Sequence, residues 1–181
     1  TTDGSIASSS SITNNGTLTY NLVGTRTYSN VISGTGGLVK TGAGQLILAG
    51  ANEYVGGTTI DGGSIRVDHA AGFGTATVTV SAGTYAMFWA PSAMTVANNF
   101  VLNGSSGNGS YPTLTHDGGS GLVTLSGTIT LNATSEIGMG STTSNGMEIT
   151  GVIIGTGGLV VDESNGGTPC TLTLSNANTY T

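Results

Sequence analysis

Apolar and polar residues alternate along most of this chain in short runs. In residues 16–23, Leu18, Tyr20 and Leu22 alternate with Thr and Asn. A period of two residues is the pattern of a β-strand that buries one face and exposes the other. The same pattern predicts further strands at 46–48, 58–60, 64–67, 76–80, 85–89, 94–96, 100–102, 122–125, 128–131, 147–150, 159–161 and 171–174.

Glycine pairs separate several of these runs, at Gly36–Gly37, Gly56–Gly57 and Gly62–Gly63. We expect sharp turns with positive φ there, because glycine adopts them without steric cost. Asn52 and Asn178 each lie just before a Tyr, where an Asn side chain can bond its own turn or stack into an inward ladder of amides.

Strands this short suit a solenoid, in which each turn of the chain lays its strand beside the previous one. The backbone groups of each strand then pair with the turns above and below, so none is buried without a partner. The alternation predicts an interior that contains Leu46, Leu48, Ile60, Ile65 and Val67.

The sequence also repeats part of itself near its C-terminus. Residues 155–160 repeat residues 34–39, at an offset of 155 − 34 = 121 residues, and 172–180 echo 46–54, at an offset of 172 − 46 = 126. The additional residues fall in 162–170. A long internal echo indicates an architecture built from repeated units.

Residues 34–65 carry the most specific pattern, Gly-Thr-Gly-Gly-Leu-Val-Lys-Thr-Gly-Ala-Gly-Gln-Leu-Ile-Leu followed by Asn-Glu-Tyr-Val-Gly-Gly-Thr-Thr-Ile. This segment resembles the autotransporter-associated β-strand repeat. Residues 77–85 look like the next strand pair, and 155–181 look like a second, more divergent copy in which an insertion replaces the Lys-Thr-Gly-Ala-Gly corner. Residues 81–150 match in pattern only.

The resemblance implies a right-handed parallel β-helix in the passenger or stalk of a large secreted or surface-displayed bacterial protein. Residues 1–181 are then a single β-helix segment, part of a longer array or fibre. At about 20 residues per coil, the chain would make about nine coils.

The composition supports an all-β fold. Glycine accounts for 32 of 181 residues, and charged residues make up 7% where ~25% is usual. Glycine, Thr and Val lose too much conformational freedom in helices to favour them. The chain is not expected to be disordered, because its apolar residues recur regularly and its net charge is only −6.

The charges exclude some partners. The chain has only three cationic residues, Arg26, Lys40 and Arg66, and they do not form the basic cluster that nucleic acid requires. No apolar run approaches ~18 residues, so this segment is not expected to enter a membrane. Cys170 is the only cysteine, which excludes an intrachain disulfide.

We find no predicted catalytic, cofactor-binding or metal-binding residue. Arg66, Asp68 and His69 are the nearest approach to a cluster, and they are interpreted as a solvated strand end. His116, Asp117 and Ser120 lie too close in sequence for a catalytic triad, because adjacent residues on a turn point in different directions. Asp-Gly-Gly at residues 61 and 117 is interpreted as turn capping rather than calcium ligation. No enzyme activity is therefore predicted.

The densest aromatic stretch is Tyr85-Ala-Met-Phe-Trp89. On a strand, Tyr85, Met87 and Trp89 share one face, and Ala86 and Phe88 share the other. An outward Tyr85 and Trp89 would form a stacking platform for a sugar ring or a partner protein. Alternatively, Trp89 covers an end or a seam of the core.

The two ends of the sequence are complementary. Residues 176–181 carry the first half of the repeat motif, and residues 1–6 carry a shortened second half. We therefore expect copies to stack end to end, with contacts from Thr1, Thr2, Asn178, Tyr180 and Thr181. The alternative is an arbitrary boundary within a longer chain.

These observations favour a structural role, as an extracellular or cell-surface rod, adhesin stalk or self-associating fibre unit. Its partners would be other copies of itself, or a protein or glycan on a host or neighbouring cell. The alternative is a glycan-binding or glycan-processing β-helix. A groove lined by carboxylates with Tyr85 or Trp89 would favour that alternative, whereas a smooth polar surface would favour the structural role.

Overall fold

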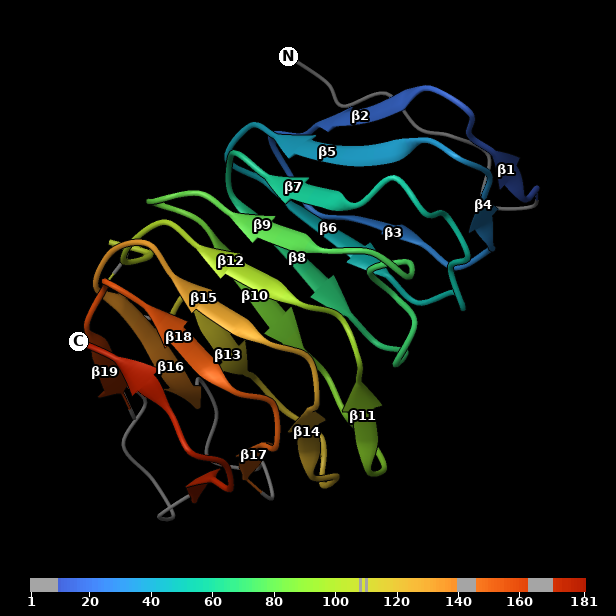
Figure 1. Cartoon of the computed structure of the whole chain (residues 1–181). Helices are drawn as coiled ribbons and strands as arrows, with labels where there is room; N and C mark the ends of the chain where they lie inside the picture. Colours follow the sequence, from blue (N-terminus) through green and yellow to red (C-terminus); the bar gives the residue numbers. More distant parts are fainter. Residues whose placement is uncertain (1–9, 108, 110, 140–145, 163–170) are drawn as a thin grey trace.

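The fold is a solenoid of parallel strands. The computed structural model describes residues 10–107, 109, 111–139, 146–162 and 171–181. These residues form 21 short strands and no helix, and every strand pair is parallel. Figure 1 shows the chain winding repeatedly in one direction, with each turn beside the one before. The prediction of an all-β parallel solenoid is confirmed, and its handedness stays a prediction.

Two long sheets form the main sides of the solenoid (Figure 1). The eight-stranded sheet contains β2 (Thr17–Asn21), β5 (Gly37–Thr41), β7 (Thr58–Ile60), β9 (Val78–Val80), β12 (Phe100–Leu102), β15 (Ile129–Leu131), β18 (Ile153–Gly155) and β21 (Thr179–Tyr180). The seven-stranded sheet contains β3 (Arg26–Tyr28), β6 (Gln45–Leu48), β8 (Ser64–Val67), β10 (Tyr85–Phe88), β13 (Leu114–His116), β16 (Ser135–Met139) and β19 (Leu159–Asp162).

The third side is less regular. It begins with the pair β1 (Ile12–Thr13) and β4 (Ile32–Ser33). The next two turns cross this side without a strand. A four-stranded sheet follows, formed by β11 (Met94–Val96), β14 (Val123–Leu125), β17 (Met147–Ile149) and β20 (Leu172–Leu174).

The later turns are longer than the first ones. Leu38 pairs with Thr58, a step of 58 − 38 = 20 residues, whereas Phe100 pairs with Ile129, a step of 129 − 100 = 29. From β11 onward the third side has its own strand, and a long connection separates the end of β12 at Leu102 from the start of β13 at Leu114. The described residues therefore make about seven turns. The expectation of about nine was too high, because it assumed ~20 residues in every coil.

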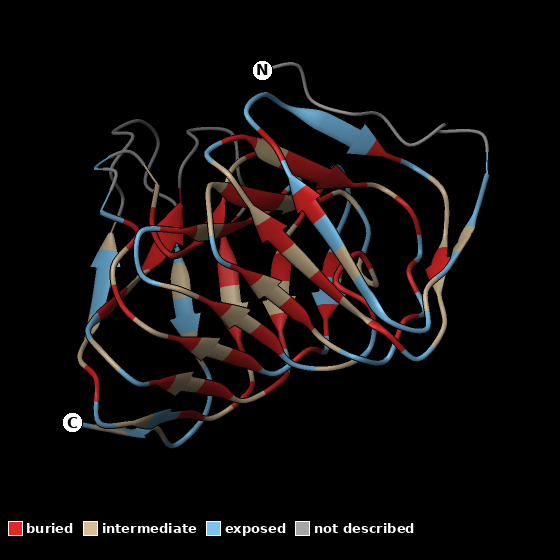
Figure 2. Cartoon of the chain, turned by 90° about the horizontal axis from the view of Figure 1, so that it is seen from above, coloured by how far each residue is buried: buried red, intermediate tan, exposed pale blue. Residues whose placement is uncertain are grey.

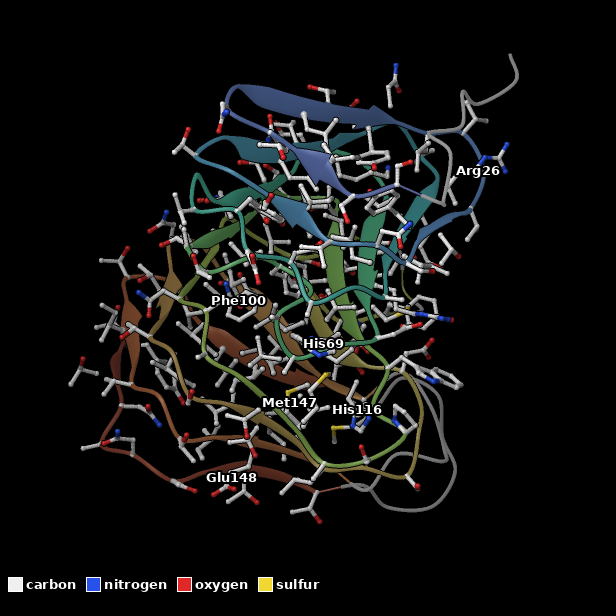
Figure 3. The ribbon with its side chains drawn as sticks, turned by 90° about the vertical axis from the view of Figure 1, so that its right-hand side faces the viewer. Arg26, His69, Phe100, His116, Met147 and Glu148 are labelled. Carbon is white, nitrogen blue, oxygen red and sulfur yellow. The ribbon has the colours of Figure 1, made fainter. Side chains whose placement is uncertain are left out.

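Alternation places apolar residues inside the solenoid. Figure 2 shows buried positions recurring along the strands of successive coils. In the middle of the core, the ring of Phe73 packs edge-to-face on Phe88 and Phe100, with centroids 6.1 and 5.9 Å away. Figure 3 shows Phe100 among the strands in the middle of the molecule and Arg26 at its periphery. The five residues predicted to point inward, Leu46, Leu48, Ile60, Ile65 and Val67, all have 0% exposure.

Lys40 points into the core, which the sequence pattern did not predict. It lies in register between Tyr20 and Ile60, and it is fully buried. Its ammonium group donates hydrogen bonds to the carbonyl oxygens of Thr41, Gly42 and Gly62 at 2.7, 2.8 and 3.0 Å. An ammonium has three N–H bonds. Lys40 therefore satisfies the corner carbonyls of two successive turns with one side chain.

Asparagine side chains also tie neighbouring turns together. The Asn52 side chain accepts a hydrogen bond from the backbone N–H of Ile32 at 2.8 Å and donates one to the Gly72 carbonyl at 2.7 Å. Asn178 accepts one from the N–H of Ile153 at 2.8 Å. These two side chains bond the backbone of a neighbouring turn, in place of the amide-to-amide ladder that the sequence allowed.

The two copies of the sequence motif occupy different sides of the solenoid. Residues 37–41 form β5 in the eight-stranded sheet, whereas 159–162 form β19 in the seven-stranded sheet. Similarly, β6 belongs to the seven-stranded sheet, whereas β20, from the echoing residues 172–174, belongs to the four-stranded sheet. Relative to the first copy, the second copy is therefore shifted by one side of the three-sided solenoid.

Stacked glycines let successive turns approach closely at one corner. Positive φ occurs at Gly57 and Gly63 (86° and 60°), as expected, but not at Gly36 or Gly37. Gly37 instead lies within β5, and Gly36 is required for space. A Cβ at position 36 would overlap the carbonyl oxygen of Gly16 in the preceding turn.

We predict that Gly36→Ala destabilises the fold by about 1–3 kcal/mol, because the two turns must separate to admit the methyl group. Gly16→Ala is the matched control, since a Cβ there meets no atom within 4 Å. Urea unfolding followed by circular dichroism measures both. Equal stability of the two variants would contradict the proposed close contact.

We also predict that Lys40→Met lowers the free energy of unfolding by about 2–5 kcal/mol. The substitution keeps the apolar stem but leaves three carbonyl oxygens without their charged donor. Arg26→Met is the control, because Arg26 is an exposed basic residue on the terminal strand β3 and its loss should cost less than ~0.5 kcal/mol. Similar unfolding midpoints for both variants would show that Lys40 contributes little.

Candidate binding groove on the seven-stranded sheet

The outer face of the seven-stranded sheet gathers polar and aromatic side chains from successive turns. Strand pairing places Gln45, Ser64 and Tyr85 in one row across β6, β8 and β10. Arg66 and Met87 share the neighbouring row. A third row, one residue beyond the strand ends, contains Asp68, Trp89 and Asp117. Residues about one turn apart in sequence thus become lateral neighbours at the ~4.8 Å strand spacing.

A shallow groove with a volume of about 400 Å³ runs over this face. It begins at the corner formed by Val23, Gly24 and Thr25 and continues across four more turns. The remaining lining residues are Ala43, Gly44, Gln45, Ser64, Arg66, Tyr85, Met87, Tyr111 and Asp117. This volume lies within the range of small-molecule binding sites, ~300–1,000 Å³.

Two tyrosines form an aromatic wall in the groove. The rings of Tyr85 and Tyr111 stack with centroids 5.2 Å apart and an interplanar angle of 18°. Tyr111 comes from the long loop between β12 and β13. The loop is anchored where the hydroxyl of Ser106 donates to the Tyr111 carbonyl and that of Ser105 donates to Glu136 at 2.6 Å. The aromatic wall is therefore held by strand β10 through Tyr85 and by the anchored loop through Tyr111.

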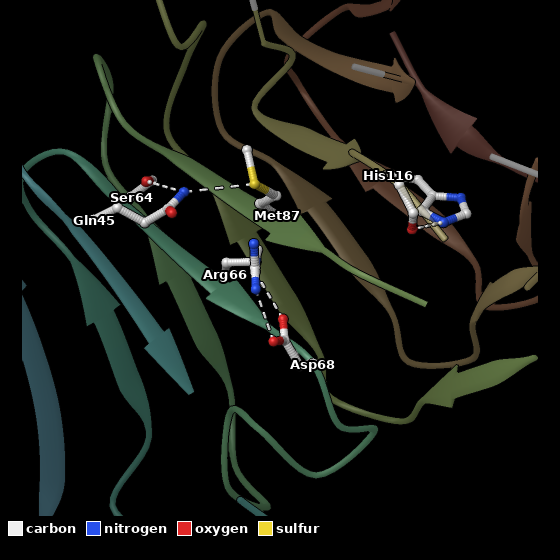
Figure 4. A network of polar contacts seen from close by, with 7 residues as sticks. Gln45, Ser64, Arg66, Asp68, Met87 and His116 are labelled. Atoms are coloured by element: carbon white, nitrogen blue, oxygen red, sulfur yellow. Dashed lines mark hydrogen bonds and ion pairs between the residues drawn. The ribbon is translucent and has the colours of Figure 1, made fainter. Parts of the chain in front are cut away.

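Arg66 is fixed by a half-buried ion pair. Its Nε and Nη2 each donate a hydrogen bond of 2.8 Å to the carboxylate of Asp68 (Figure 4). Its guanidinium carbon lies 5.1 Å from the centroid of the Trp89 ring. Paired donation and the aromatic contact fix the orientation of the guanidinium plane. The N–H bonds of Nη1 remain outside this ion pair. Of the three residues interpreted as a solvated strand end, Arg66 and Asp68 are therefore half-buried and packed beside Trp89, whereas His69 is exposed.

Gln45 links three strands of the groove floor. Its side-chain amide nitrogen lies 3.3 Å from the Ser64 hydroxyl and 3.5 Å from the Met87 sulfur (Figure 4). Ser64 and Met87 are themselves buried, at 2% and 3% exposure. These contacts position the amide group across the groove without a charged residue.

Asp117 is the acidic group of the groove. Burial raises the pKa of its carboxyl group to about 6, and the positive charge of Arg66 opposes that rise. A carboxylic acid with such a pKa changes charge near neutral pH. Asp117 therefore differs from Asp68, whose carboxylate is engaged by the Arg66 guanidinium.

His116 and Asp117 lie on opposite faces of the sheet. His116 is fully buried. Its Nδ1 lies 3.0 Å from the carbonyl oxygen of Gly146, and its Nε2 lies 3.0 Å from that of Gly118. Burial lowers the pKa of this imidazole, and the two backbone hydrogen bonds oppose that change. The Ser120 hydroxyl donates to the Pro91 carbonyl at 3.3 Å. These three residues therefore do not form a triad.

Tyr85 and Trp89 both face outward, while Ala86 and Phe88 have 0% exposure in the core. The two aromatics nevertheless do not form a joint platform. Trp89 is 38% exposed and lies in the third row, where its ring covers Gly118 so closely that a Cβ there would overlap it. Tyr85 pairs instead with Tyr111, which sequence reasoning missed. A partner role for Tyr85 and Trp89 stays a prediction.

The last turn places the predicted end-contact residues at one end of the solenoid. Tyr180 lies in β21, the final strand of its sheet, and the Thr181 hydroxyl donates to the Thr156 carbonyl at 3.4 Å. Nearby apolar side chains are exposed, with Val160 at 44% and Val161 at 53%. Thr1, Thr2 and Cys170 fall outside the described residues. Contact between ends stays a prediction.

The described part of the chain contains no group of three or more His, Cys, Asp or Glu side chains placed to hold a metal ion. The Asp61 carboxylate accepts a hydrogen bond of 2.6 Å from Ser81 in the next turn. In the same residues, no helix is long and apolar enough to cross a bilayer.

Comparison with known families identifies one segment. Residues 38–67 match the family model of the passenger-associated-transport-repeat. The match spans β5 to β8 and confirms the resemblance of residues 34–65 to an autotransporter passenger repeat. No curated protein and no solved structure matches the chain.

We predict opposite effects of Asp117 and His116 on acid stability. The folded pKa of Asp117 is raised from 3.8 to about 6, so its stabilising contribution is present at low pH and lost as the pH rises through 6. The folded pKa of His116 is lowered from 6.5, so acidification below about 6.5 favours the unfolded chain.

Urea unfolding between about pH 5 and pH 8 separates the two contributions. Asp117→Asn should be more stable than the parent above pH 7, with an advantage that shrinks below pH 6. His116→Gln should lose packing at every pH, yet its stability should decline less on acidification. A difference between Asp117→Asn and the parent that does not vary with pH would contradict the first expectation.

Proposed function

We propose that this chain is a structural segment of an autotransporter-type passenger, exposed at a bacterial cell surface or secreted. The passenger-associated-transport-repeat at residues 38–67 supports this proposal, because passenger repeats of this family are structural and belong to surface or secreted proteins. The observation that carries it is the parallel ladder of the eight-stranded sheet, continuous from β2 to β21.

The mechanism is geometric. Eight strands at ~4.8 Å intervals span about 34 Å along the axis. Each fully buried Leu, Ile or Val side chain contributes roughly 1.5–3 kcal/mol, so the core needs no metal or disulfide to hold successive turns together. Hydrogen bonds from Lys40 and Asn52 join neighbouring turns at the corners. Such a segment acts as a stalk or spacer that holds other surfaces away from the cell.

Self-association at the ends is part of this proposal. The exposed Val160 and Val161 lie on β19, the last strand of the seven-stranded sheet, and Tyr180 lies on the last strand of the eight-stranded sheet. Terminal strands of a sheet present backbone groups that pair readily with another strand. Stacking of copies would use Asn178, Tyr180 and Thr181 at one end and Thr1 and Thr2 at the other.

A second candidate function, glycan binding, is favoured by the groove. It combines the Tyr85–Tyr111 wall with Arg66 and Asp117, which is the combination of aromatic and carboxylate groups expected of a glycan-binding β-helix. Glycan processing is less favoured. Glycoside hydrolysis uses two carboxyl groups, and Asp68 is already engaged by Arg66.

Inserting additional turns tests the proposal that this segment is a rod. Because Leu38 pairs with Thr58, residues 38–57 constitute one turn, and five further copies placed after Gly57 restore the register at every step. We predict a folded protein about 24 Å longer, as five strand spacings require. Small-angle X-ray scattering measures the length.

A variant with the inserted residues in scrambled order is the control for this experiment. It should retain the parent's folded dimensions and add an unfolded segment. The rod proposal fails if the five ordered copies also appear as an unfolded segment, or if they form a separate compact particle.

A further inference from the structure

We propose that the groove binds an extended, uncharged oligosaccharide that lies along the solenoid axis. This inference rests on glycan binding as the second candidate function, and it adds the class of ligand and its direction. The ligand would cross the strands rather than follow one of them, because the lining residues come from successive turns.

The shape of the groove favours a chain over a single sugar. Its lining runs from Thr25 in the first turn through Gln45, Ser64 and Tyr85 to Asp117 in the fifth. Four strand spacings of ~4.8 Å separate these turns, so the groove extends over about 19 Å. A monosaccharide would contact one or two turns, whereas an oligosaccharide can contact all five.

The polar groups suit hydroxyl groups, which both donate and accept hydrogen bonds. The Nη1 of Arg66 provides donors, while the Asp117 carboxylate and the side-chain oxygen of Gln45 provide acceptors. Arg66 is held in place by Asp68, and the amide of Gln45 is held by Ser64 and Met87. A ligand therefore meets polar groups whose positions are already fixed, which reduces the entropy lost on binding.

Charge argues against ionic ligands. Arg66 contributes +1 and an ionised Asp117 contributes −1 to the lining of the groove. Asp68, which is paired with Arg66 outside that lining, contributes a further −1, so the groove together with its ion pair carries a net charge of −1. This charge, within a chain of net charge −6, disfavours an acidic sugar such as a uronate. Arg66 at the centre of the groove disfavours a cationic ligand in the same way. An uncharged glycan avoids both costs.

The aromatic wall supplies the apolar contact. Tyr85 is fixed on β10 and stacks against Tyr111 from the loop before β13. A stacked pair holds its rings rigid, so an outer ring face can accept the C–H face of a sugar with little ordering cost. Met87 adds an apolar floor beside this wall.

Binding is tested with defined oligosaccharides and the full chain. The probes are the uncharged hexasaccharides of β-1,4-linked glucose, β-1,4-linked N-acetylglucosamine and α-1,4-linked glucose, together with glucose and hexagalacturonate. Isothermal titration calorimetry at pH 7.5 should show binding of at least one uncharged hexasaccharide, with glucose and hexagalacturonate at least about tenfold weaker, a difference of 1.4 kcal/mol. Absence of binding by all three uncharged hexasaccharides, or tighter binding of hexagalacturonate, overturns the proposal.

Variants locate the site. Tyr85→Ala should weaken binding of the hexasaccharide by about tenfold or more, and Tyr85→Phe should keep most of the affinity, because the ring is retained. Thr79→Ala is the matched control, since Thr79 faces outward on β9 in the opposite, eight-stranded sheet. Unchanged melting temperatures verify the fold. Equal affinity of Tyr85→Ala and Thr79→Ala overturns the assignment of the site.

Asp117→Asn tests the argument from charge. It removes the net negative charge of the groove, so the gap in affinity between hexagalacturonate and the uncharged hexasaccharide should narrow by a few-fold. A gap that stays the same shows that charge does not select the ligand.

The protein with five inserted turns separates this proposal from that of the rod. Each inserted copy of residues 38–57 contains its own Gln45, so the turn before Ser64 keeps its side chains. An elongated variant that does not bind counts against the groove alone. A variant that binds without elongation counts against the rod alone.

Discussion

Backbone pairing between successive turns is the constraint on which this structure depends. Parallel strands lie at a fixed spacing of ~4.8 Å, so any group between two turns must fit that interval or bridge it. At the corner containing Gly36, the interval leaves no space for a Cβ. Where a corner leaves carbonyl oxygens inside, Lys40 supplies donors for them, and Asn52 supplies a donor and an acceptor to the turns on either side. The glycine-rich composition fits this requirement at the corners where turns approach closely.

The same constraint assembles the groove. Alternation along each strand directs Ser64 and Tyr85 outward, and the pairing register then places them side by side. In a solenoid, outward residues that lie one turn apart in sequence therefore form a continuous surface along the axis. The irregular part of the fold adds what regular turns cannot supply. The long turn from Phe100 to Ile129 includes the loop that carries Tyr111 back onto Tyr85.

The sequence predicts some levels of this structure well and others poorly. Strands β11 and β12 are predicted to the residue, because β11 alternates apolar and polar residues and β12 is a short apolar run between asparagines. The strand β5 is missed, since its glycine and its inward lysine both depart from a half-buried strand pattern. Tyr111 could not be predicted as a partner of Tyr85, because their contact depends on the length of one particular turn. Local alternation is visible in a sequence, whereas turn length and register are properties of the assembled coil.

The displaced second copy of the motif shows what the repeat encodes. Each side of the solenoid is a parallel ladder with the same spacing, so a strand–corner–strand unit can occupy any pair of adjacent sides. The type of residue that suits an inward position then depends on which side of the solenoid the strand occupies. In the eight-stranded sheet, Lys40 lies beside corner carbonyl groups that need donors. Its counterpart in sequence, Val161, pairs in register with the buried Ile137 of the seven-stranded sheet. It lies in line with that apolar core row, and the last turn leaves it 53% exposed. The motif therefore encodes local geometry, and its place in the coil determines which side chain it requires.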